Sequence, residues 1–348
     1  MKHSLLGRFF KRRSLVNLPV LLAASVSFFF AQAPVAQAAA EATKIELFLA
    51  PNTDSTPLWA AYSQGFYKDA GLDVTIRTFP SGSTAFQAYR SGLGTLVMSG
   101  DLPSLLYWIS SKQDYRAIMV LTRHTKGYVV QALKDITKAQ DLEGKSVATR
   151  VGSSGSWLLS EFLAKNGVDE SKVKVLNLDT NQMPIALCKG DIAAFFVWQP
   201  FGSQAQARCD DKVHQLADAK GYMRGYTVLG ARPAWLKDNR DAAIAFVQAT
   251  TRGAVWAEEN PAELAAYLEA NYGADAKFSE NVLTFMDLTP LFDQQFHDDY
   301  TSLSAWHMKS AGADAEAVPI DFANFIWTDG VDTLTADKLP AVPAAAKD

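Results

Sequence analysis

Residues 173–201 read VKVLNLDTNQMPIALCKGDIAAFFVWQPF and contain a complete strand–helix–strand unit. The apolar pattern of 172–176 predicts a strand, and residues 182–188 predict a helix. This helix is expected to end at Gly190, because glycine readily adopts the left-handed conformation that closes a helix. The apolar run at 193–197 predicts a second strand. Short strands that alternate with helices build parallel sheet units, so this stretch indicates an α/β protein.

The same alternation occurs twice along the chain. Strands are predicted at 44–49, 73–79, 95–98 and 117–121, and again at 146–150, 172–176 and 193–197. A helix is predicted between successive strands of each series, and the recurrence is one of pattern rather than of identical residues. It predicts two similar lobes in series. Residues 127–132 are expected to carry the chain into the second lobe, and residues 226–231 to carry it back.

These crossings define the expected domains. The first lobe comprises residues 41–125 and 227–348, and the second comprises residues 126–226. Each is expected to contain a mixed sheet flanked by helices, and the two crossings form a hinge. Residues 232–348 read mainly as helices that complete the first lobe, predicted at 239–258, 261–271, 279–286, 292–310 and 322–328.

The N-terminus resembles an export signal. Its basic region ends at Arg12 and Arg13, an apolar run follows, and the small residues Ala36-Gln37-Ala38 close it. We expect residues 1–40 to be a signal peptide, cleaved after Ala38 or Ala40. An uncleaved membrane anchor is the alternative, and the arginine pair also suits twin-arginine export. The mature protein is therefore expected in a periplasm.

The charge balance argues against nucleic-acid binding. The chain has 33 basic and 37 acidic residues, and removing the five basic residues of 1–40 changes the net charge from −4 to −9. Nucleic-acid binders need a basic surface, and the remaining chain has no block of like charge. With 48% hydrophobic and 20% charged residues, the composition is that of a folded protein.

The two cysteines, Cys188 and Cys209, are too few for a disulfide scaffold or a four-cysteine metal site. In an oxidising compartment they could form a disulfide. The alternative is one buried and one exposed thiol, and sequence spacing alone does not decide between them.

A ligand of an open α/β sheet binds beyond the carboxyl ends of the strands. Six predicted loops lie there, three per lobe, and they are rich in glycine and in small hydroxyl residues. The candidate ligand-binding residues in these loops are Asp54, Ser55, Thr56, Ser81, Gly82, Ser83, Thr84, Gly100, Asp101, Arg150, Gly152, Ser153, Ser154, Ser156, Thr180 and Trp198.

Two of these loops, residues 81–84 and 152–156, come directly before predicted helices. A helix N-terminus offers unpaired N–H groups, and glycine allows close approach, which suits a small oxyanion. Ordinary N-capping is the alternative for these hydroxyls. Arg150 could add a charged contact or form a salt bridge at the end of its strand. Trp198 is expected to form a wall of the cleft.

Three acidic residues, Asp54, Asp101 and Asp179, also lie in the loops. An ammonium group on the ligand would bind one of them. Helix capping is the alternative for each, most clearly for Asp101, which precedes Leu102 and Pro103.

Four stretches, residues 57–92, 141–168, 173–201 and 231–263, resemble the nitrate/sulfonate/taurine-type periplasmic substrate-binding proteins of ABC importers. The resemblance covers nearly all of residues 44–310 and implies the type II periplasmic-binding-protein fold. It also implies that a small solute is held between the lobes and delivered to a permease that works with a cytoplasmic ATPase. Family ligand contacts fall on residues 83–84, 100–101, 153–154 and 198.

The resemblance favours a sulfonate or taurine-like anion as the solute. A pyrimidine, an aromatic acid or another small solute is the alternative. The chain departs from the family in its second-lobe loop, where Trp157 follows GSSGS, and in its first-lobe loop, where NTDSTP (52–57) replaces the usual aromatic.

Other classes of function find less support in the sequence. Gly152–Ser156 misses the G-x-S-x-G hydrolase motif by one position, the histidines are not paired at metal-ligand spacing, and no phosphate-binding loop is present. We therefore expect no enzymatic activity, no cofactor and no metal site, and we expect a monomer. A ligand-loaded sensor module with the same fold is an alternative class, and an enzyme is the least favoured alternative.

Overall fold

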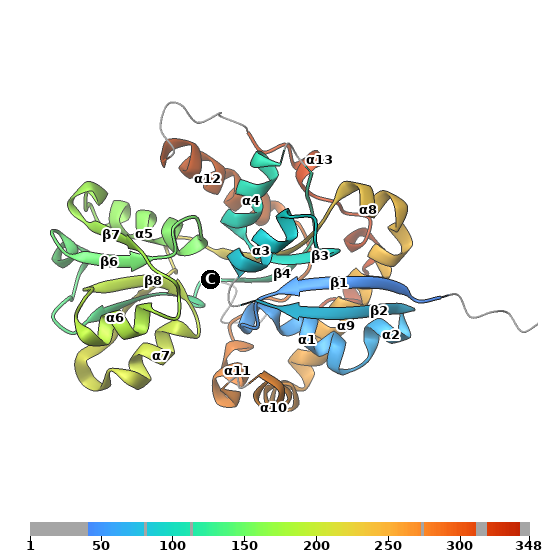
Figure 1. Ribbon diagram of the computed structural model, residues 1–348, viewed down its shortest axis with the longest axis horizontal. Helices are drawn as coiled ribbons and strands as arrows, with labels where there is room; N and C mark the ends of the chain where they lie inside the picture. The colour runs from blue at the N-terminus through green and yellow to red at the C-terminus, as the bar shows by residue number, and fades with distance from the viewer. Residues whose placement is uncertain (1–40, 80–81, 112–113, 273–274, 311–318, 342–348) are drawn as a thin grey trace, which may run out of the picture. The chain divides into compact units, whose positions relative to one another are not determined.

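The computed structural model describes residues 41–79, 82–111, 114–272, 275–310 and 319–341, without the side chains of Ser83 and Phe278. These residues belong to one compact unit, Glu41–Asp348 (Figure 1). The expected signal peptide and Ser81 lie outside the described residues.

The first sheet has five strands in the order β2-β1-β3-β10-β4. Its strands are β1 (Thr43–Leu49), β2 (Leu72–Thr78), β3 (Leu96–Gly100), β4 (Arg116–His124) and β10 (Gly225–Ala231). β1 pairs in parallel with β2 and β3, whereas β10 runs antiparallel to β3 and β4. The return crossing predicted at 226–231 is thus a strand of this sheet.

The second sheet repeats the arrangement in the order β7-β6-β8-β5-β9. Its strands are β5 (Tyr128–Leu133), β6 (Ser146–Thr149), β7 (Lys174–Asn177), β8 (Ala194–Trp198) and β9 (Val213–Asp218). β6 is parallel to β7 and β8, and β5 is antiparallel to β8 and β9. Both sheets are mixed, as expected; β9, an edge strand, was not predicted.

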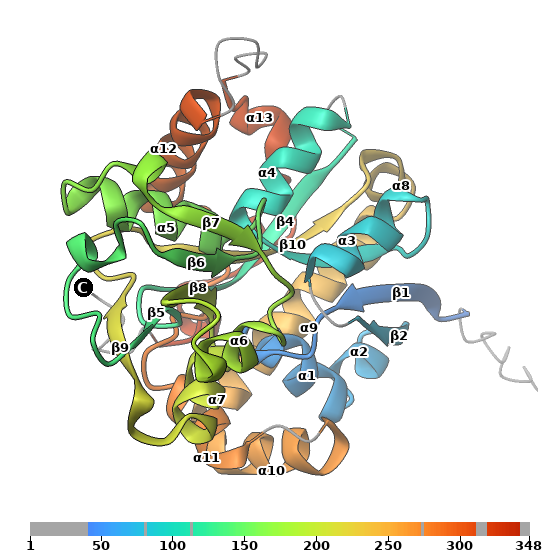
Figure 2. The ribbon, with the colours of Figure 1, turned by 60° about the vertical axis from the view of Figure 1, so that its left-hand side comes forward.

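Helices cover both sheets (Figures 1 and 2). Those connecting the strands are α1 (Thr56–Ser63), α2 (Phe66–Asp69), α3 (Gly82–Arg90), α4 (Asp101–Ser110), α5 (Ser154–Lys165), α6 (Met183–Lys189) and α7 (Phe201–Arg208). The C-terminal helices are α8 (Pro233–Asp238), α9 (Arg240–Glu259), α10 (Pro261–Tyr272), α11 (Ala276–Val282), α12 (Gln294–Ser310) and α13 (Phe322–Phe325). Among the described residues, no helix combines the length and apolar character needed to cross a bilayer.

The predicted helix at 58–70 is two helices, α1 and α2. Gly65 lies between them with a φ of 74°, a left-handed conformation that interrupts a helix. α1 also begins earlier than predicted, because Pro57 occupies its first turn, where the missing N–H costs nothing.

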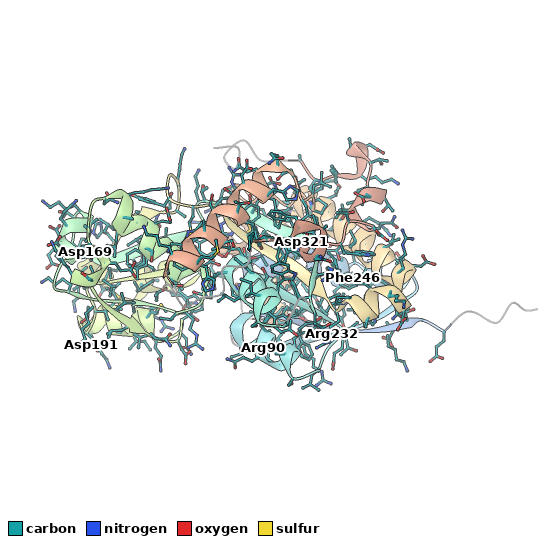
Figure 3. The ribbon with its side chains drawn as sticks, turned by 90° about the horizontal axis from the view of Figure 1, so that it is seen from above. Arg90, Asp169, Asp191, Arg232, Phe246 and Asp321 are labelled. Atoms are coloured by element: carbon teal, nitrogen blue, oxygen red, sulfur yellow. A yellow bond between two sulfur atoms is a disulfide. The ribbon has the colours of Figure 1, made fainter. Side chains whose placement is uncertain are left out.

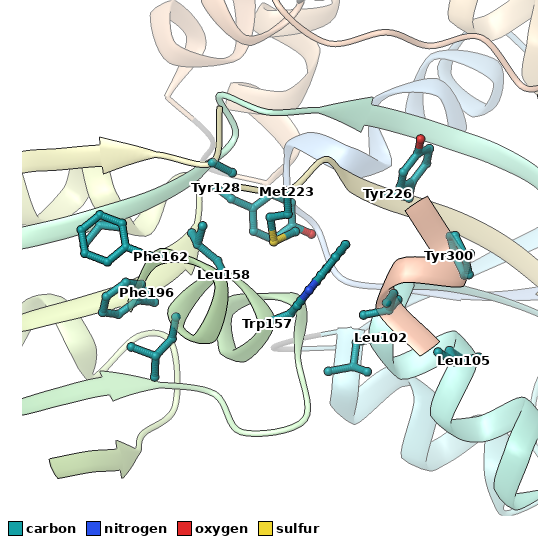
Figure 4. Packing of buried hydrophobic residues seen from close by; sticks show 14 of the residues in the cluster. Leu102, Leu105, Tyr128, Trp157, Leu158, Phe162, Phe196, Met223, Tyr226 and Tyr300 are labelled. Carbon is teal, nitrogen blue, oxygen red and sulfur yellow. The ribbon is translucent and has the colours of Figure 1, made fainter. Parts of the chain in front are cut away.

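One hydrophobic cluster extends through both halves of the molecule. It includes Leu102 and Leu105 of α4 together with Trp157, Leu158 and Phe162 of α5. Figure 4 shows Trp157 between the residues of the two helices. α4 and α5 are in contact, so the two sheets share apolar packing at this point.

The C-terminal region is joined to β4 through Arg123, which is 2% exposed. Its guanidinium forms ion pairs with Asp293 at 2.5 Å and with Asp287 at 3.6 Å. It also donates to the backbone carbonyls of Thr289 and Leu291. The segment between α11 and α12 is therefore fixed to the end of β4, an edge strand of the first sheet.

Arg232, just before α8, anchors the far end of α3. Its guanidinium donates to the carbonyls of Gly94 and Tyr89 and lies 3.9 Å from the centre of the Tyr89 ring. In Figure 3, Arg90 and Arg232 lie in the half that contains the first sheet, whereas Asp169 and Asp191 lie in the half that contains the second sheet. This anchoring fixes α3, whose N-terminus faces the site described next.

Cys188, in α6, and Cys209, directly after α7, form a disulfide with their Cα atoms 5.0 Å apart. Of the two alternatives left by the sequence, the structure therefore contains the bonded pair. The disulfide joins two adjacent helices of the second half.

Candidate functional site

A small cavity of about 40 Å³ lies where loops from both sheets meet. Its lining residues come from both halves of the molecule: Asn52, Asp54, Gly82, Met98, Ser99, Gly100, Pro103, Tyr128, Ser153, Ser154, Trp198 and Thr227. Because a water molecule needs about 10–15 Å³ by this measure, the cavity has room for about three waters.

Six of the predicted site residues line this cavity, namely Asp54, Gly82, Gly100, Ser153, Ser154 and Trp198. They come from the carboxyl ends of strands in both sheets, where the sequence placed the binding loops. Four lining residues are within two positions of predicted ones, namely Asn52, Met98, Ser99 and Pro103.

Tyr128 and Thr227 were missed because they belong to β5 and β10, the strands that coincide with the two predicted crossings. Such strands run antiparallel to their neighbours and give no loop signal in the sequence. Their position near the start of each predicted crossing, at 127–132 and 226–231, is the clue that could have identified them.

Several other predicted residues do not line the cavity. Ser55 and Thr56 instead donate to the carbonyls of Asn52 and Thr53, within their own turn. Thr180 is buried. Thr84, Gly152 and Ser156 are also outside the lining, while Ser81 and the Ser83 side chain lie beyond the described residues.

Arg150 is engaged elsewhere, because its guanidinium forms an ion pair with Asp179 at 3.1 Å. This is the strand-end salt bridge that the sequence left as an alternative. No lysine or arginine is among the described residues that line the cavity.

The start of α5 is capped locally. The Ser153 hydroxyl accepts a hydrogen bond from the Gly155 N–H at 3.2 Å and donates to the Arg150 carbonyl at 2.6 Å. The Ser156 hydroxyl donates to the Ser153 carbonyl at 2.6 Å. Both serines thus serve the helix end, and this end still presents its partial positive charge to the cavity.

Asp101 joins three elements of the fold. Its Oδ1 accepts a hydrogen bond from the Ser154 hydroxyl of α5. The same oxygen accepts from the N–H of Leu102 at 2.6 Å. Its Oδ2 accepts from Tyr226 N of β10 at 3.0 Å. Burial raises the pKa of Asp101 to about 6, although these three hydrogen bonds act in the opposite direction. The Asp101–Ser154 hydrogen bond connects the two halves directly behind the cavity.

Asp54 is held by β4. It is 3% exposed, and its Oδ1 accepts from the Thr122 hydroxyl at 3.1 Å and from His124 Nε2 at 3.0 Å. His124 Nδ1 accepts from Gly127 N at 3.0 Å, so the ring proton is on Nε2 and the imidazole is neutral. His124, near the predicted hinge, therefore orients a cavity residue.

Two aromatic rings complete the lining. Tyr128 and Trp198 are edge to face, with ring centroids 6.5 Å apart, and Tyr128 also stacks on His124 at 5.3 Å. The prediction of Trp198 as a cleft wall agrees with its place in the lining. No set of three or more metal-ligating side chains is found in the described part of the chain.

Residues 52–264 match the family described as NMT1/THI5 like. The chain is 24% identical over 213 residues to the binding protein YtlA of Bacillus subtilis (strain 168), a match that covers 60% of this chain and 64% of YtlA. It is 27% identical over 169 residues to the taurine-binding periplasmic protein of Escherichia coli (strain K12), covering 48% of this chain and 52% of that protein. Both matches thus span less than two thirds of the relative's length.

Among solved structures, the alkanesulfonate-binding protein SsuA from Xanthomonas axonopodis pv. citri, bound to MOPS, has a TM-score of 0.71. It is 19% identical, and the superposition covers 83% of this chain and all of that one. At this identity the likeness concerns the fold, and it confirms the expected periplasmic-binding-protein architecture. Because the family match extends over more than half of the chain, the chain belongs to the NMT1/THI5-like family.

Proposed function

We propose that this protein is the solute-binding component of an ABC importer that captures a small organic anion, a sulfonate or a taurine-like compound, between its two halves. The observation that carries the proposal is the cavity between the loops of both sheets, which faces the starts of α3 and α5 and whose described lining contains no cationic side chain. Backbone N–H groups at helix starts bind oxyanions without a charged side chain.

The relatives support this function. One is named for taurine binding and the structural neighbour for alkanesulfonate binding. In this proposal no bond of the solute is made or broken, and the protein delivers the solute to a membrane permease with its ATPase.

The proposal includes two lobes, residues 41–125 with 227–348 and residues 126–226, that open and close about the two crossings. With room for about three waters, the cavity is smaller than an organic sulfonate, so the lobes must separate before the solute enters. The bound solute would then bridge both lobes and favour the closed form.

We further propose that residues 1–40 direct export and are removed, so that the mature protein acts as a monomer in the periplasm. N-terminal sequencing of the secreted protein would test the cleavage after Ala38 or Ala40.

Thermal unfolding with candidate solutes tests the function. A solute present at a hundred times its Kd stabilises the native state by about 2.7 kcal/mol and raises the melting temperature. We expect such a rise with taurine or a short alkanesulfonate, compared with nitrate, carboxylates and pyrimidines. The absence of a rise with any sulfonate would contradict the proposed solute class.

A variant connects the effect to the cavity. Gly82 lines it, and a Cβ added there would meet no atom within 4 Å, so Gly82→Leu adds a bulky side chain to the lining at a position where its first carbon has room. We expect Gly82→Leu to keep the melting temperature of the free protein and to lose the solute-induced rise. Ser91→Leu, at an exposed position directly after α3, is the matched control and should keep both.

A further inference from the structure

Two residues that line the cavity have a side-chain oxygen with no hydrogen-bond donor among the described residues. Asp54 has a buried carboxylate, and within the described part of the chain both of its hydrogen bonds use Oδ1, leaving Oδ2 without one. Asn52 has a buried Oδ1 with no hydrogen-bond partner among the described residues. Both residues line the cavity. The buried Asn52 oxygen is costly unless a donor reaches it, and Oδ2 of Asp54 can accept a further hydrogen bond.

The protein itself does not neutralise Asp54. The only ionisable group described in contact with its carboxylate is His124, whose ring is neutral because Nδ1 accepts the Gly127 N–H. The other partner is the uncharged hydroxyl of Thr122. A buried carboxylate without a cationic partner is unfavourable, so the site is suited to a cation brought by the ligand.

The rest of the lining is compatible with a positively charged group. Trp198 and Tyr128 lie in the same cavity, and aromatic rings attract cations in sites that exclude water. An ammonium group offers three N–H donors and can therefore donate to more than one acceptor of the lining.

We propose that the solute carries a protonated amino group in addition to its anionic group, and that Asp54 with Asn52 binds this amine. This inference rests on the proposed function and narrows its solute class to amino-substituted sulfonates. The anionic group would lie at the starts of α3 and α5 and the ammonium group at Asp54. Plain alkanesulfonates and nitrate would satisfy only the first of these two subsites.

The test compares matched pairs of solutes on the wild-type protein by titration calorimetry: taurine against ethanesulfonate, and 3-aminopropanesulfonate against propanesulfonate. Because a hydrogen bond to a charged group contributes about 1.5–3 kcal/mol, the amino compound of at least one pair should bind about tenfold to a hundredfold more tightly. This comparison requires no variant. Equal affinities within both pairs would overturn the inference and leave the proposed sulfonate binding intact, whereas no binding of any of the four would overturn both.

A substitution identifies the residue. Asp54→Asn keeps the size of the side chain and an Oδ1 that can accept from Thr122 and His124, but it removes the charge. It should lower the affinity for the amino compound, relative to that for its plain partner, at least tenfold. Asp179→Asn removes an acid outside the cavity and serves as the control. An unchanged preference in folded Asp54→Asn, or an equal loss for both solutes, would overturn the assignment; if that variant does not fold, the same criteria apply to Asn52→Ala.

Discussion

Asp101 is a buried residue whose carboxylate connects the two halves of the molecule. Its carboxylate joins α4, β10 and α5 by hydrogen bonds, and its burial raises its pKa from 3.8 to about 6. A folded-state pKa above that of the unfolded chain means that ionisation of this group opposes folding. The protein therefore retains the Asp101–Ser154 connection at neutral pH at a cost in stability.

This cost predicts a pH dependence. Well below pH 3.8 Asp101 is protonated in both states and contributes nothing; the cost develops as pH rises from about 4 and approaches its full value of about 3 kcal/mol above about pH 6. Urea unfolding of wild type and Asp101→Asn between pH 4 and 7 should show the variant gaining relative stability by up to this amount as pH rises. Parallel stability profiles for the two proteins would contradict the assignment.

At the scale of elements, two glycines show where helix boundaries were predicted correctly from the sequence and where they were not. Gly190 was correctly predicted to close α6, and its φ is 78°. Gly65 has the same left-handed conformation but lay inside a predicted helix, because the apolar pattern continues across it. A local pattern reports which face is buried, whereas the break depends on how α1 and α2 pack on their neighbours.

The candidate site was predictable to the same extent. Residues at the ends of parallel strands, such as Ser153 and Trp198, follow from the general rule for α/β sheets. Tyr128 and Thr227 enter the cavity from antiparallel strands whose partners lie far away in the sequence. Likewise, the pairing of Asp54 with His124 depends on the register of β4 with the rest of the sheet, which no local signal encodes.

α1 and α9 offer a test of close helix packing. A Cβ on Gly253 of α9 would lie 2.6 Å from backbone atoms of Pro57 and Ala61 in α1, which cannot yield as a side chain can. Replacing glycine by alanine within a helix ordinarily stabilises it by about 0.5–1 kcal/mol, but overpacking costs about 1–3 kcal/mol. We expect the clash to dominate and Gly253→Ala to lower the melting temperature. Gly82→Ala, where the added methyl meets open space, should leave it nearly unchanged.

For the whole molecule, the contact between the halves combines apolar and polar parts. Trp157 packs within the cluster shared by α4 and α5, and the Ser154 hydroxyl donates to Asp101 beside it. The polar part depends on one donor meeting one carboxylate. Replacing the Ser154 hydroxyl by a negatively charged acceptor should therefore change the relative position of the halves rather than the packing of either core.

Ser154→Asp would bring two carboxylates face to face across the contact, and like charges repel strongly where water is excluded. We expect this variant to stay open, with a larger radius of gyration by small-angle scattering and at least tenfold weaker solute binding. Wild type should become more compact when saturated with solute. Ser156→Asp is the control, since the Ser156 hydroxyl bonds only within its own helix turn and an acid is favourable there. Equal radii for the two variants would argue against a hinge controlled at this contact.

The ion pairs and carbonyl contacts of Arg123 have a practical consequence for anyone who shortens the protein. A fragment that ends before Asp287 would retain every described strand. It would, however, leave the buried guanidinium of Arg123 without a carboxylate partner, next to His124, which positions Asp54. The second sheet, whose strands all lie between Tyr128 and Asp218, could be excised as one continuous piece. Its counterpart has to be built from two separate pieces of chain, and the later piece must reach at least Asp293.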